Sequence, residues 1–255
     1  MSLSASAITA VWRRNVTMYA RTWQWNLLPN FFEPVFYLAA LGIGVGAYVS
    51  EMAGMSYVQF LAPGLVCVAA MNGASYEVTY NVYVRLNMQR TYDVMLTAPI
   101  EPEDVVWGEL IWAMTRVLLY GGSFYIVTIL FGLAPLPESI LVIPVILLAG
   151  FLFATLGLAF SLWIQSVDLF SFYFTLFLTP LFLFSDVFFP IAERLSGFWL
   201  GIAECLPLLH PVRLARASFA GSFGWIALWD MAYIALLSGL LARFSMQLMR
   251  RRLTS

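Results

Sequence analysis

Six long stretches of this sequence are almost free of charge, and they constrain the fold more than any other feature. They cover residues 34–50, 52–76, 117–137, 139–167, 169–185 and 217–242, the last with Asp230 as its single charge. A bilayer core of about 30 Å needs about 20 mostly apolar residues per helix. Membrane barrels instead use alternating strands of about 10 residues. We therefore predict an all-α integral membrane protein with six spans, near residues 32–50, 57–80, 106–131, 139–163, 169–189 and 225–245.

The composition excludes several classes of protein. Only 11% of the 255 residues are charged, whereas soluble domains carry about 25%. The net charge of −1 gives no electrostatic footprint for nucleic acid. All 13 basic residues are arginine, so no P-loop lysine is present and any ATP must bind to another chain. With two distant cysteines and one histidine, His210, we expect neither a metal site nor a cofactor on this chain, and a structural role for His210.

The placement of the arginines predicts the orientation. With the N-terminus inside, nine arginines fall on the cytoplasmic side, and only Arg194, Arg213 and Arg216 fall outside. The positive-inside rule therefore places both termini in the cytoplasm.

The first 30 residues are predicted to form an amphipathic helix on the inner leaflet. Ile8, Trp12, Val16, Tyr19 and Trp23 recur at helical spacing, with arginines beside them. Aromatic rings of this kind sit at the level of the lipid headgroups, so membrane lipids are the expected partner. A solvated leader is the alternative.

The loop between the second and third spans mixes charged and apolar residues. Residues 85–96 have the pattern of a short amphipathic helix, and Pro99 ends it because proline excludes helical backbone at the preceding residue. Pro102, followed by Glu103 and Asp104, is typical of a helix start. A short cytoplasmic helix between two breaks has the shape needed to push on a partner. An ordinary connecting loop is the alternative that periodicity leaves open.

The segment from residue 185 to 216 is too apolar for a solvated external loop, and three prolines interrupt it. Backbone that enters a membrane without crossing it must be covered by protein or line a cavity. We therefore expect a re-entrant pair of short helices over residues 188–216.

Charged residues within spans cost about 2.5–3.5 kcal/mol at a helix centre and are functional candidates by default. Glu77 lies near the inner end of the second span, while Glu109 and Arg116 lie two turns apart on the third. We expect these three to pair inside the bundle, and we favour a structural contact over a substrate contact. Glu33 and Asp230 are expected at the membrane interfaces.

Two sequence patterns carry a family resemblance. Phe188-Phe189-Pro190-Ile191, followed by Pro207, Pro211 and Arg216, resembles the signature of the ABC-2 type transport permeases. Residues 91–99 and 108–113 resemble one branch of it, the nodulation-type lipo-oligosaccharide exporter permeases. The resemblance covers nearly the whole chain, so residues 1–255 are expected to form a single transmembrane domain.

The resemblance implies a permease half that pairs with a second copy, as a homodimer, and with two cytosolic ATP-binding subunits that hold ATP and Mg²⁺. Residues 85–98 would be the coupling helix that docks into the ATPase. Its contact residues would be Arg85, Arg90, Thr91, Tyr92, Asp93 and Leu96. Asp186 departs from the family, which often carries a small residue, typically glycine, at this place. We expect that carboxylate to affect the outer end of the transport pathway.

The predicted function is therefore that of a permease subunit, not an enzyme, in an ATP-driven exporter of the bacterial inner membrane. The cargo would be an amphiphile such as a lipo-oligosaccharide or glycolipid, or alternatively a hydrophobic drug or toxin. A membrane-embedded transferase for lipid-linked sugars would need clustered acidic residues, and a helix start explains the cluster at 101–104. An ion-coupled carrier would favour internal repeats, and the sequence has no clear repeat. Both of these alternatives predict activity without an ATPase.

Overall fold

A computed structural model of the chain describes residues 3–49, 51–191 and 195–254. Within these residues, six helical stretches are long and apolar enough to cross a membrane, which confirms the all-α prediction. They are Trp23–Val45, Tyr57–Met88, Pro102–Leu130, Glu138–Trp163, Val167–Phe184 and Trp225–Leu253. The strands β1 (Glu51–Met52) and β2 (Met55–Ser56) form a short antiparallel hairpin after the first span.

The first span begins earlier than expected. Helix α1 (Ala5–Ala20) stops at a break near residues 21–22, and α2 (Trp23–Ala39) continues as the π-helical η1 (Ala40–Val45). Residues 23–30 therefore belong to the helix that continues into the candidate span, and the chain breaks near residues 21–22 rather than at the expected boundary between 30 and 32. The charge-free run begins only after Glu33, so a criterion based on charge places the start of the span too late.

Helix α1 packs against α5 (Pro102–Leu130). Its buried residues, Ala7, Val11 and Asn15, lie on the face that contacts α5. They are not members of the aromatic stripe that was expected to face the membrane. Gly108 of α5 allows this approach, because a Cβ added there would lie 2.5 Å from Cβ of Val11. At its start, the backbone N–H of Ser4 donates to Asp104 Oδ1 (3.0 Å). The leader is thus attached to the bundle along one face.

The central helices start where the sequence provides caps. Helix α3 (Tyr57–Tyr76) begins with a reciprocal capping box between Ser56 and Gln59. Asp104 and Glu101 cap α5 in the same way, which confirms the predicted helix start at Pro102. The second span then continues through two π-helical segments, η2 (Glu77–Asn81) and η3 (Val84–Met88). Of the predicted coupling segment 85–98, only α4 (Thr91–Met95) forms a separate helix.

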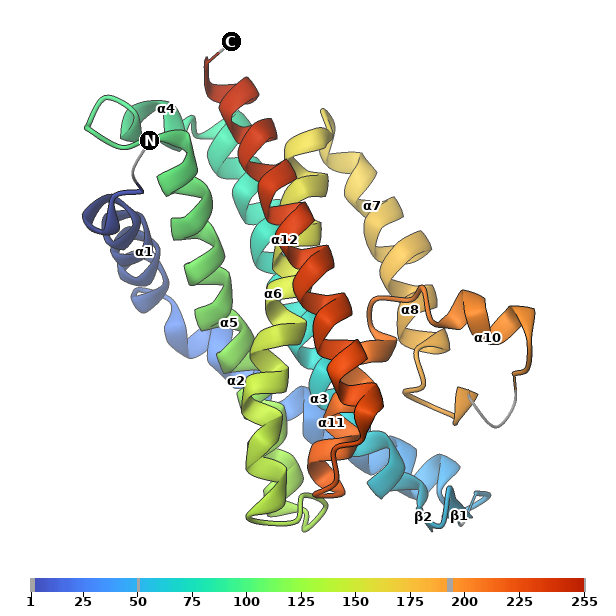
Figure 1. Cartoon of the computed structure of the whole chain (residues 1–255). Coiled ribbons are helices and arrows are strands. Elements are labelled where there is room, and N and C mark those ends of the chain that lie inside the picture. Colours follow the sequence, from blue (N-terminus) through green and yellow to red (C-terminus); the bar gives the residue numbers. More distant parts are fainter. Residues whose placement is uncertain (1–2, 50, 192–194, 255) are drawn as a thin grey trace.

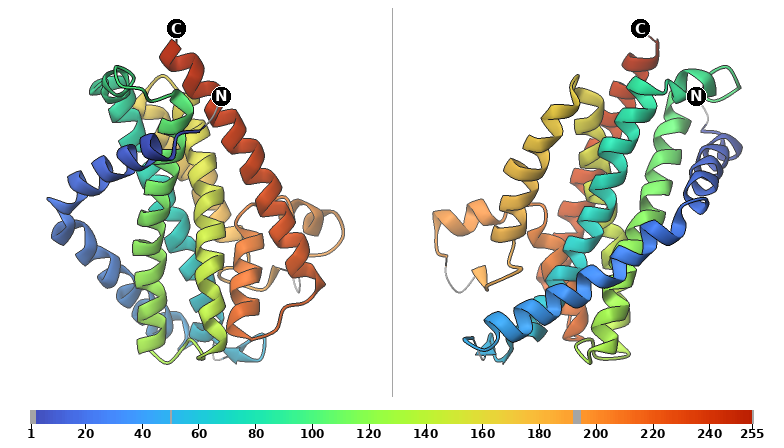
Figure 2. Two further views of the ribbon diagram at one scale, coloured as in Figure 1. Left: turned by 60° about the vertical axis from the view of Figure 1, so that its left-hand side comes forward. Right: turned by 180° about the vertical axis from the view of Figure 1, so that it is seen from behind.

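The second span lies at the centre of the bundle. Helix α3 contacts α5, α6 (Val142–Trp163) and α11 (Leu209–Phe219), and α12 (Trp225–Thr254) packs along α6. The 3₁₀ turn η4 (Glu138–Leu141) leads into α6. The first span runs diagonally across the outside of this core, as the right-hand view of Figure 2 shows.

The fifth span is assembled from short segments that join end to end. They are η5 (Val167–Leu169), α7 (Phe170–Phe172), η6 (Tyr173–Leu178) and α8 (Thr179–Phe184). Aromatic contacts attach this span to α3 and η2, including Tyr76 stacked on Phe174 with ring centroids 5.2 Å apart. The hydroxyl groups of Tyr173 and Ser75 lie 3.2 Å apart, within hydrogen-bonding distance.

The segment between the fifth and sixth spans contains α10 (Phe198–Ala203) and α11. Residues 192–194 of the predicted re-entrant segment lie outside the described residues. Helix α11 has 11 residues, too few to cross a bilayer, and it packs among α3, α6 and α12. This arrangement fits the predicted re-entrant segment (Figure 1).

Both chain ends and α4 lie at the same end of the bundle (Figures 1 and 2). The β-hairpin and the α5–α6 connection lie at the opposite end.

Candidate functional site

An ion-pair network lies inside the end of the bundle that carries α4. Arg85 of η3 donates to Glu77 of η2 (Nη2 to Oε1, 2.8 Å) and to Glu109 of α5 (Nη1 to Oε2, 2.5 Å). Both carboxylates are buried, Glu109 completely. A buried charge without a partner is strongly unfavourable. Arg85 supplies the opposite charge to both carboxylates and so joins the second span to the third.

The leader and the rest of the third span also contact this network. Asn15 of α1 donates to Glu109 Oε2 (3.1 Å), and Asn81 donates to Glu77 Oε2 (3.0 Å). Arg116 Nε lies 3.6 Å from Glu77 Oε2. The expected pairing inside the bundle is therefore present, with Arg116 on Glu77. The partner of Glu109 is Arg85, which the sequence analysis had assigned to the cytoplasmic surface.

Tyr92 attaches α4 to the same network. Its phenol is fully buried and donates to Glu109 Oε1 (3.0 Å). Burial, and then the neighbouring carboxylate of Glu109, raise the pKa of Tyr92 well above its usual value. The phenol therefore stays protonated and remains a hydrogen-bond donor.

The six predicted coupling residues fall into two groups. Tyr92 is fully buried and Arg85 is half-buried, and the polar groups of both are engaged with Glu109. Their predicted contact with the ATPase stays a prediction. The hydrophobic periodicity of 85–96 does not reveal which face is covered. The other four are exposed or half-buried: Arg90, Thr91, Asp93 and Leu96.

The surface at the end of the bundle that carries α4 also includes two exposed apolar side chains, Met88 and Val94. Beside them, a groove of about 400 Å³ runs between α1 and the α4 region. The groove residues are Ala10, Val11, Arg14, Gln89, Thr91, Val94, Met95 and Ile100. This end therefore presents a mixed polar and apolar surface.

Asp186 and Arg216 form an ion pair after the fifth span. The guanidinium of Arg216 donates to both the carboxylate and the backbone carbonyl of Asp186 and lies over the ring of Phe60, 3.8 Å from its centroid. The φ of Asp186 is +64°, a conformation that favours glycine and that aspartate tolerates better than most residues. This backbone geometry fits the glycine often found here in the family that the sequence resembles. Asp186 thus takes part in a structural contact, and its partner Arg216 lines a cavity of about 340 Å³.

The remaining signature residues lie in the same segment, between the fifth and sixth spans. Pro207 and Pro211 are buried, the latter in α11, and its carbonyl accepts from the thiol of Cys67 on α3 (Sγ to O, 3.3 Å). Phe189 and Pro190 are half-buried. These contacts hold α11 against the second span.

A second buried network, which the sequence analysis did not predict, joins α11 to α12. His210 Nδ1 lies 2.7 Å from Asp230 Oδ1, and its Nε2 lies 3.0 Å from the carbonyl of Glu204. Arg213 pairs with both Asp230 and Glu204. Asp230 is 1% exposed and lies close to the start of α12, so at the expected outer end of the sixth span it is covered by protein and not by solvent. Its partners come from a segment distant in sequence, and no local pattern reveals them. The expected structural role of His210 agrees with these contacts.

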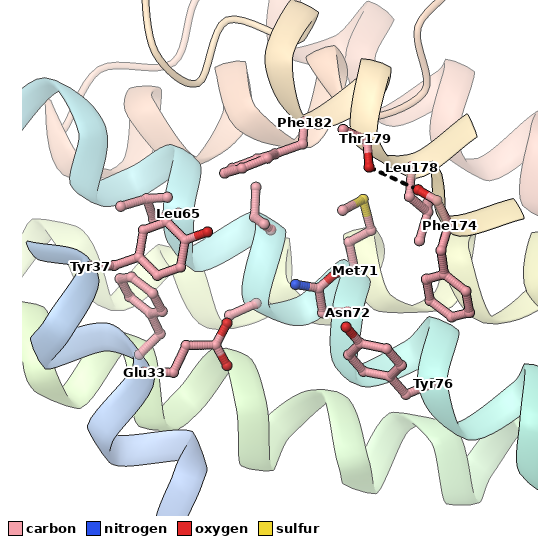
Figure 3. Close-up of a pocket in the computed structure, with 13 residues that line it drawn as sticks. Glu33, Tyr37, Leu65, Met71, Asn72, Tyr76, Phe174, Leu178, Thr179 and Phe182 are labelled. Atoms are coloured by element: carbon pink, nitrogen blue, oxygen red, sulfur yellow. Dashed lines mark hydrogen bonds between the residues drawn. The ribbon is translucent and has the colours of Figure 1, made fainter. Parts of the chain in front are cut away.

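A cavity of about 210 Å³ opens between the first, second and fifth spans (Figure 3). Five of its lining residues are polar: Glu33, Tyr37, Asn72, Tyr76 and Thr179. The others are apolar: Leu65, Val68, Ala69, Met71, Phe124, Phe174, Leu178 and Phe182. Glu33, Tyr37 and Tyr76 are exposed, so the cavity communicates with the outside of the bundle.

Glu33 is the charged residue of this cavity. In Figure 3 it reaches from α2 toward Asn72 and Tyr76 of α3. The helical stretch long and apolar enough to cross a membrane runs from Trp23 to Val45, so Glu33 lies near its middle rather than at its start. Within the described residues its carboxylate has neither a hydrogen bond nor an ion pair. No arginine is among the residues that line the cavity.

Comparison with known proteins shows to which family the chain belongs. The profile of the family described as ABC-2 type transporter matches residues 6–220. This chain belongs to the ABC-2 type transporter family. It is 34% identical to Nodulation protein J of Sinorhizobium fredii, over 96% of this chain and 94% of that protein. It is 36% identical to Nodulation protein J of Rhizobium leguminosarum bv. viciae, over 83% and 82% of the two chains. The Inner membrane transport permease YadH of Escherichia coli is 24% identical over 95% of this chain and 97% of that protein.

Membership makes the chain a multi-pass transport subunit that is not itself catalytic and that works with an ATP-binding subunit. It favours the permease interpretation over the membrane transferase and the ion-coupled carrier. For this ABC-2 permease, two of the features that the sequence did not predict bear on transport: the hydrogen bond from Tyr92 to Glu109 and the carboxylate of Glu33 in the cavity.

Proposed function

We propose that this permease exports an amphiphile, such as a lipo-oligosaccharide or another glycolipid, from the bacterial cytoplasmic membrane. Two copies of the chain would form the membrane unit, and two ATP-binding subunits would supply ATP hydrolysis with Mg²⁺. The extensive similarity to Nodulation protein J carries the proposed cargo class. The absence of lysine supports ATP binding on a separate chain.

The end of the bundle that carries α4 would face the cytoplasm. Nine of the 13 arginines fall on the cytoplasmic side of the proposed topology, in agreement with the positive-inside rule. Both chain ends lie at this end (Figure 1). The groove between α1 and α4, with exposed Val94 beside it, is the proposed contact with the ATP-binding subunit.

The internal network would carry movement from the ATPase into the spans. A displacement of α4 acts on Glu109 through Tyr92, and Glu109 is bound to Arg85 and Asn15. Three elements, α1, η3 and α5, therefore respond to one short helix. Exposed residues of α4 would make the contact, while Tyr92 and Arg85 would act as positioning residues behind it.

The test is ATP hydrolysis by the permease purified with its ATP-binding subunit in lipid nanodiscs. Val94→Asp places a charge on the proposed contact and is expected to abolish co-purification or reduce hydrolysis at least tenfold. Tyr48→Asp alters an exposed apolar side chain after η1, toward the β-hairpin end, and is the matched control. Equal co-purification and hydrolysis in both variants would contradict the proposed contact. Failure of any ATP-binding subunit to associate with the unaltered permease would overturn the proposed function.

A further inference from the structure

We propose that Glu33 selects the cargo headgroup in the cavity between the first, second and fifth spans. The selected headgroup donates hydrogen bonds and carries no net negative charge, as a polyhydroxylated sugar or an ammonium group does. This inference rests on the proposed function, because it assigns a chemical class to the cargo of the permease.

The position of Glu33 is the first argument. A carboxylate near the middle of a span is costly in lipid, and such residues generally face a partner or a water-filled pathway. Glu33 has neither a hydrogen bond nor an ion pair among the described residues, unlike Glu77 and Glu109 in the same bundle. Its carboxylate faces the cavity, toward Asn72 and Tyr76 (Figure 3). The missing partner is therefore supplied within the cavity.

The hydrogen-bonding capacity of the lining gives the second argument. An ionised carboxylate only accepts hydrogen bonds. The hydroxyl of Thr179 already donates to the carbonyl of Phe174 (2.9 Å), so toward a ligand it is an acceptor. Asn72, Tyr37 and Tyr76 provide further polar groups that both donate and accept. A ligand must therefore donate hydrogen bonds to satisfy Glu33 and Thr179.

The charge and the aromatic surfaces of the cavity narrow the class further. No basic side chain lines it, so a phosphate or carboxylate headgroup would be repelled by Glu33. Tyr76 and Phe174 stack with an interplanar angle of 19°, and Phe182 lies nearby in the lining (Figure 3). Aromatic faces suit the apolar face of a sugar or the surface of a cation. A volume of about 210 Å³ suits part of a headgroup rather than a whole amphiphile.

The test measures binding to the permease alone, in nanodiscs of neutral lipid, with three amphiphiles that share a dodecyl chain. Dodecyl maltoside presents hydroxyl groups, dodecyltrimethylammonium a cation, and dodecyl phosphate an anion. Equilibrium dialysis of the radiolabelled compounds, corrected with empty nanodiscs, gives the saturable affinity. Glu33→Gln removes the charge at almost constant volume. Glu51→Gln, an exposed carboxylate in β1, is the matched control.

We expect Glu33→Gln to weaken binding of the maltoside, the ammonium compound or both by about tenfold, as expected for loss of a charged acceptor. It should strengthen binding of dodecyl phosphate, while Glu51→Gln changes no affinity. A loss confined to the maltoside identifies a sugar headgroup, and a loss confined to the ammonium compound identifies a cationic one. Asn72→Leu, in the same cavity, should weaken the same compound and serves if Glu33→Gln does not fold.

Three results would overturn the inference. They are changes within twofold for both glutamine variants, tightest binding of dodecyl phosphate by the unaltered chain, and no saturable binding of any compound. Because no ATP-binding subunit is present, these results stand apart from the co-purification test. If no ATP-binding subunit associates but binding of the amphiphiles still depends on Glu33, only the proposed exporter assembly is refuted.

Discussion

Arg85 shows how a single side chain can bind separate helices together without contributing to a hydrophobic core. Two of its guanidinium nitrogen atoms contact carboxylates, Glu77 on η2 and Glu109 on α5. The other described partners of Glu109, Asn15 and Tyr92, are neutral donors, so they do not replace the cation. Buried ion pairs of this kind contribute little net stability as a whole, yet loss of one member leaves the others uncompensated. Removing one charge of the network should therefore cost much more stability than removing both members of an ion pair.

Arg85→Met is expected to lower the free energy of unfolding by about 3–5 kcal/mol, because Glu109 remains buried without a cation and Glu77 keeps only its longer contact with Arg116 (3.6 Å). Thermal unfolding in nanodiscs, followed by circular dichroism, measures the effect. Arg90→Met, an exposed arginine on the same loop, should change stability by less than about 0.5 kcal/mol. Adding Glu109→Gln to Arg85→Met should recover most of the loss, while Glu77 stays in place to pair with Arg116. Without that recovery, uncompensated charge would not be the cause.

Tyr92→Phe keeps the aromatic ring and removes only the hydrogen bond to Glu109. We expect amide exchange in Thr91–Met95 to accelerate by about tenfold, because a hydrogen bond to a charged group contributes about 1.5–3 kcal/mol. Thr91→Val is the control, since its hydroxyl bonds only to exposed Gln89. Unchanged exchange in Tyr92→Phe would show that packing of the ring alone holds α4. Mass spectrometry of the exchanged peptides gives the measurement.

At the scale of elements, the close contact between α1 and α5 depends on the absence of a side chain at Gly108. Val11 occupies the space that a Cβ would need, and the carbonyl of Ile8 is 3.3 Å from the same point. Gly122, farther along α5, has nothing within 4 Å of its equivalent position. The two glycines on one helix therefore provide a matched comparison.

Gly108→Ala is expected to destabilise the protein by about 1–3 kcal/mol through the clash with Val11. Gly122→Ala should instead stabilise it by about 0.5–1 kcal/mol, the ordinary gain for this change inside a helix. Val11→Ala should restore part of the stability of Gly108→Ala. Thermal unfolding of all four proteins tests the contact, and equal behaviour of the two glycine variants would contradict it.

The elements that could be predicted from the sequence are those that depend on residues close together in the chain. The six spans and the start of α5 follow from apolar length and from capping residues, which act over a few positions. The partners of Glu109 and Asp230 could not be predicted, because they come from distant segments and depend on how the helices rotate against one another. The place of Glu33 was missed because a charge-based criterion treats a lone carboxylate as the end of a span.

At the scale of the whole molecule, the first span is the least covered by the rest of the chain. Its exposed apolar residues must face lipid or a second copy: Trp23, Trp25, Leu28, Phe31, Phe32, Phe36, Tyr37, Ile43 and Val45. The cavity that Glu33 lines also opens to the outside of the bundle beside this span, and a second copy there would keep lipid away from the carboxylate. This combination favours the first span as the seam of the proposed homodimer.

Cysteine cross-linking tests that seam. In a Cys205→Ser background, Phe36→Cys on α2 should form a covalent dimer on oxidation, because a two-fold axis brings equal residues of both copies together. Leu236→Cys on α12 is equally exposed, at 69% against 67%, and should remain monomeric. Cys67 is buried and does not interfere. Denaturing gels report the result, and dimers formed only by Leu236→Cys would assign the seam to α12.

Because α4 and both chain ends lie at the same end of the bundle, the permease and an ATP-binding subunit can be joined in one polypeptide. An ATP-binding subunit fused to either end would emerge beside α4, so its linker never has to pass through the lipid (Figure 1). In the proposed orientation, a single polypeptide can therefore hold both functions in either order. It needs no added membrane segment, and a modest tether replaces free diffusion of the two subunits with a high local concentration.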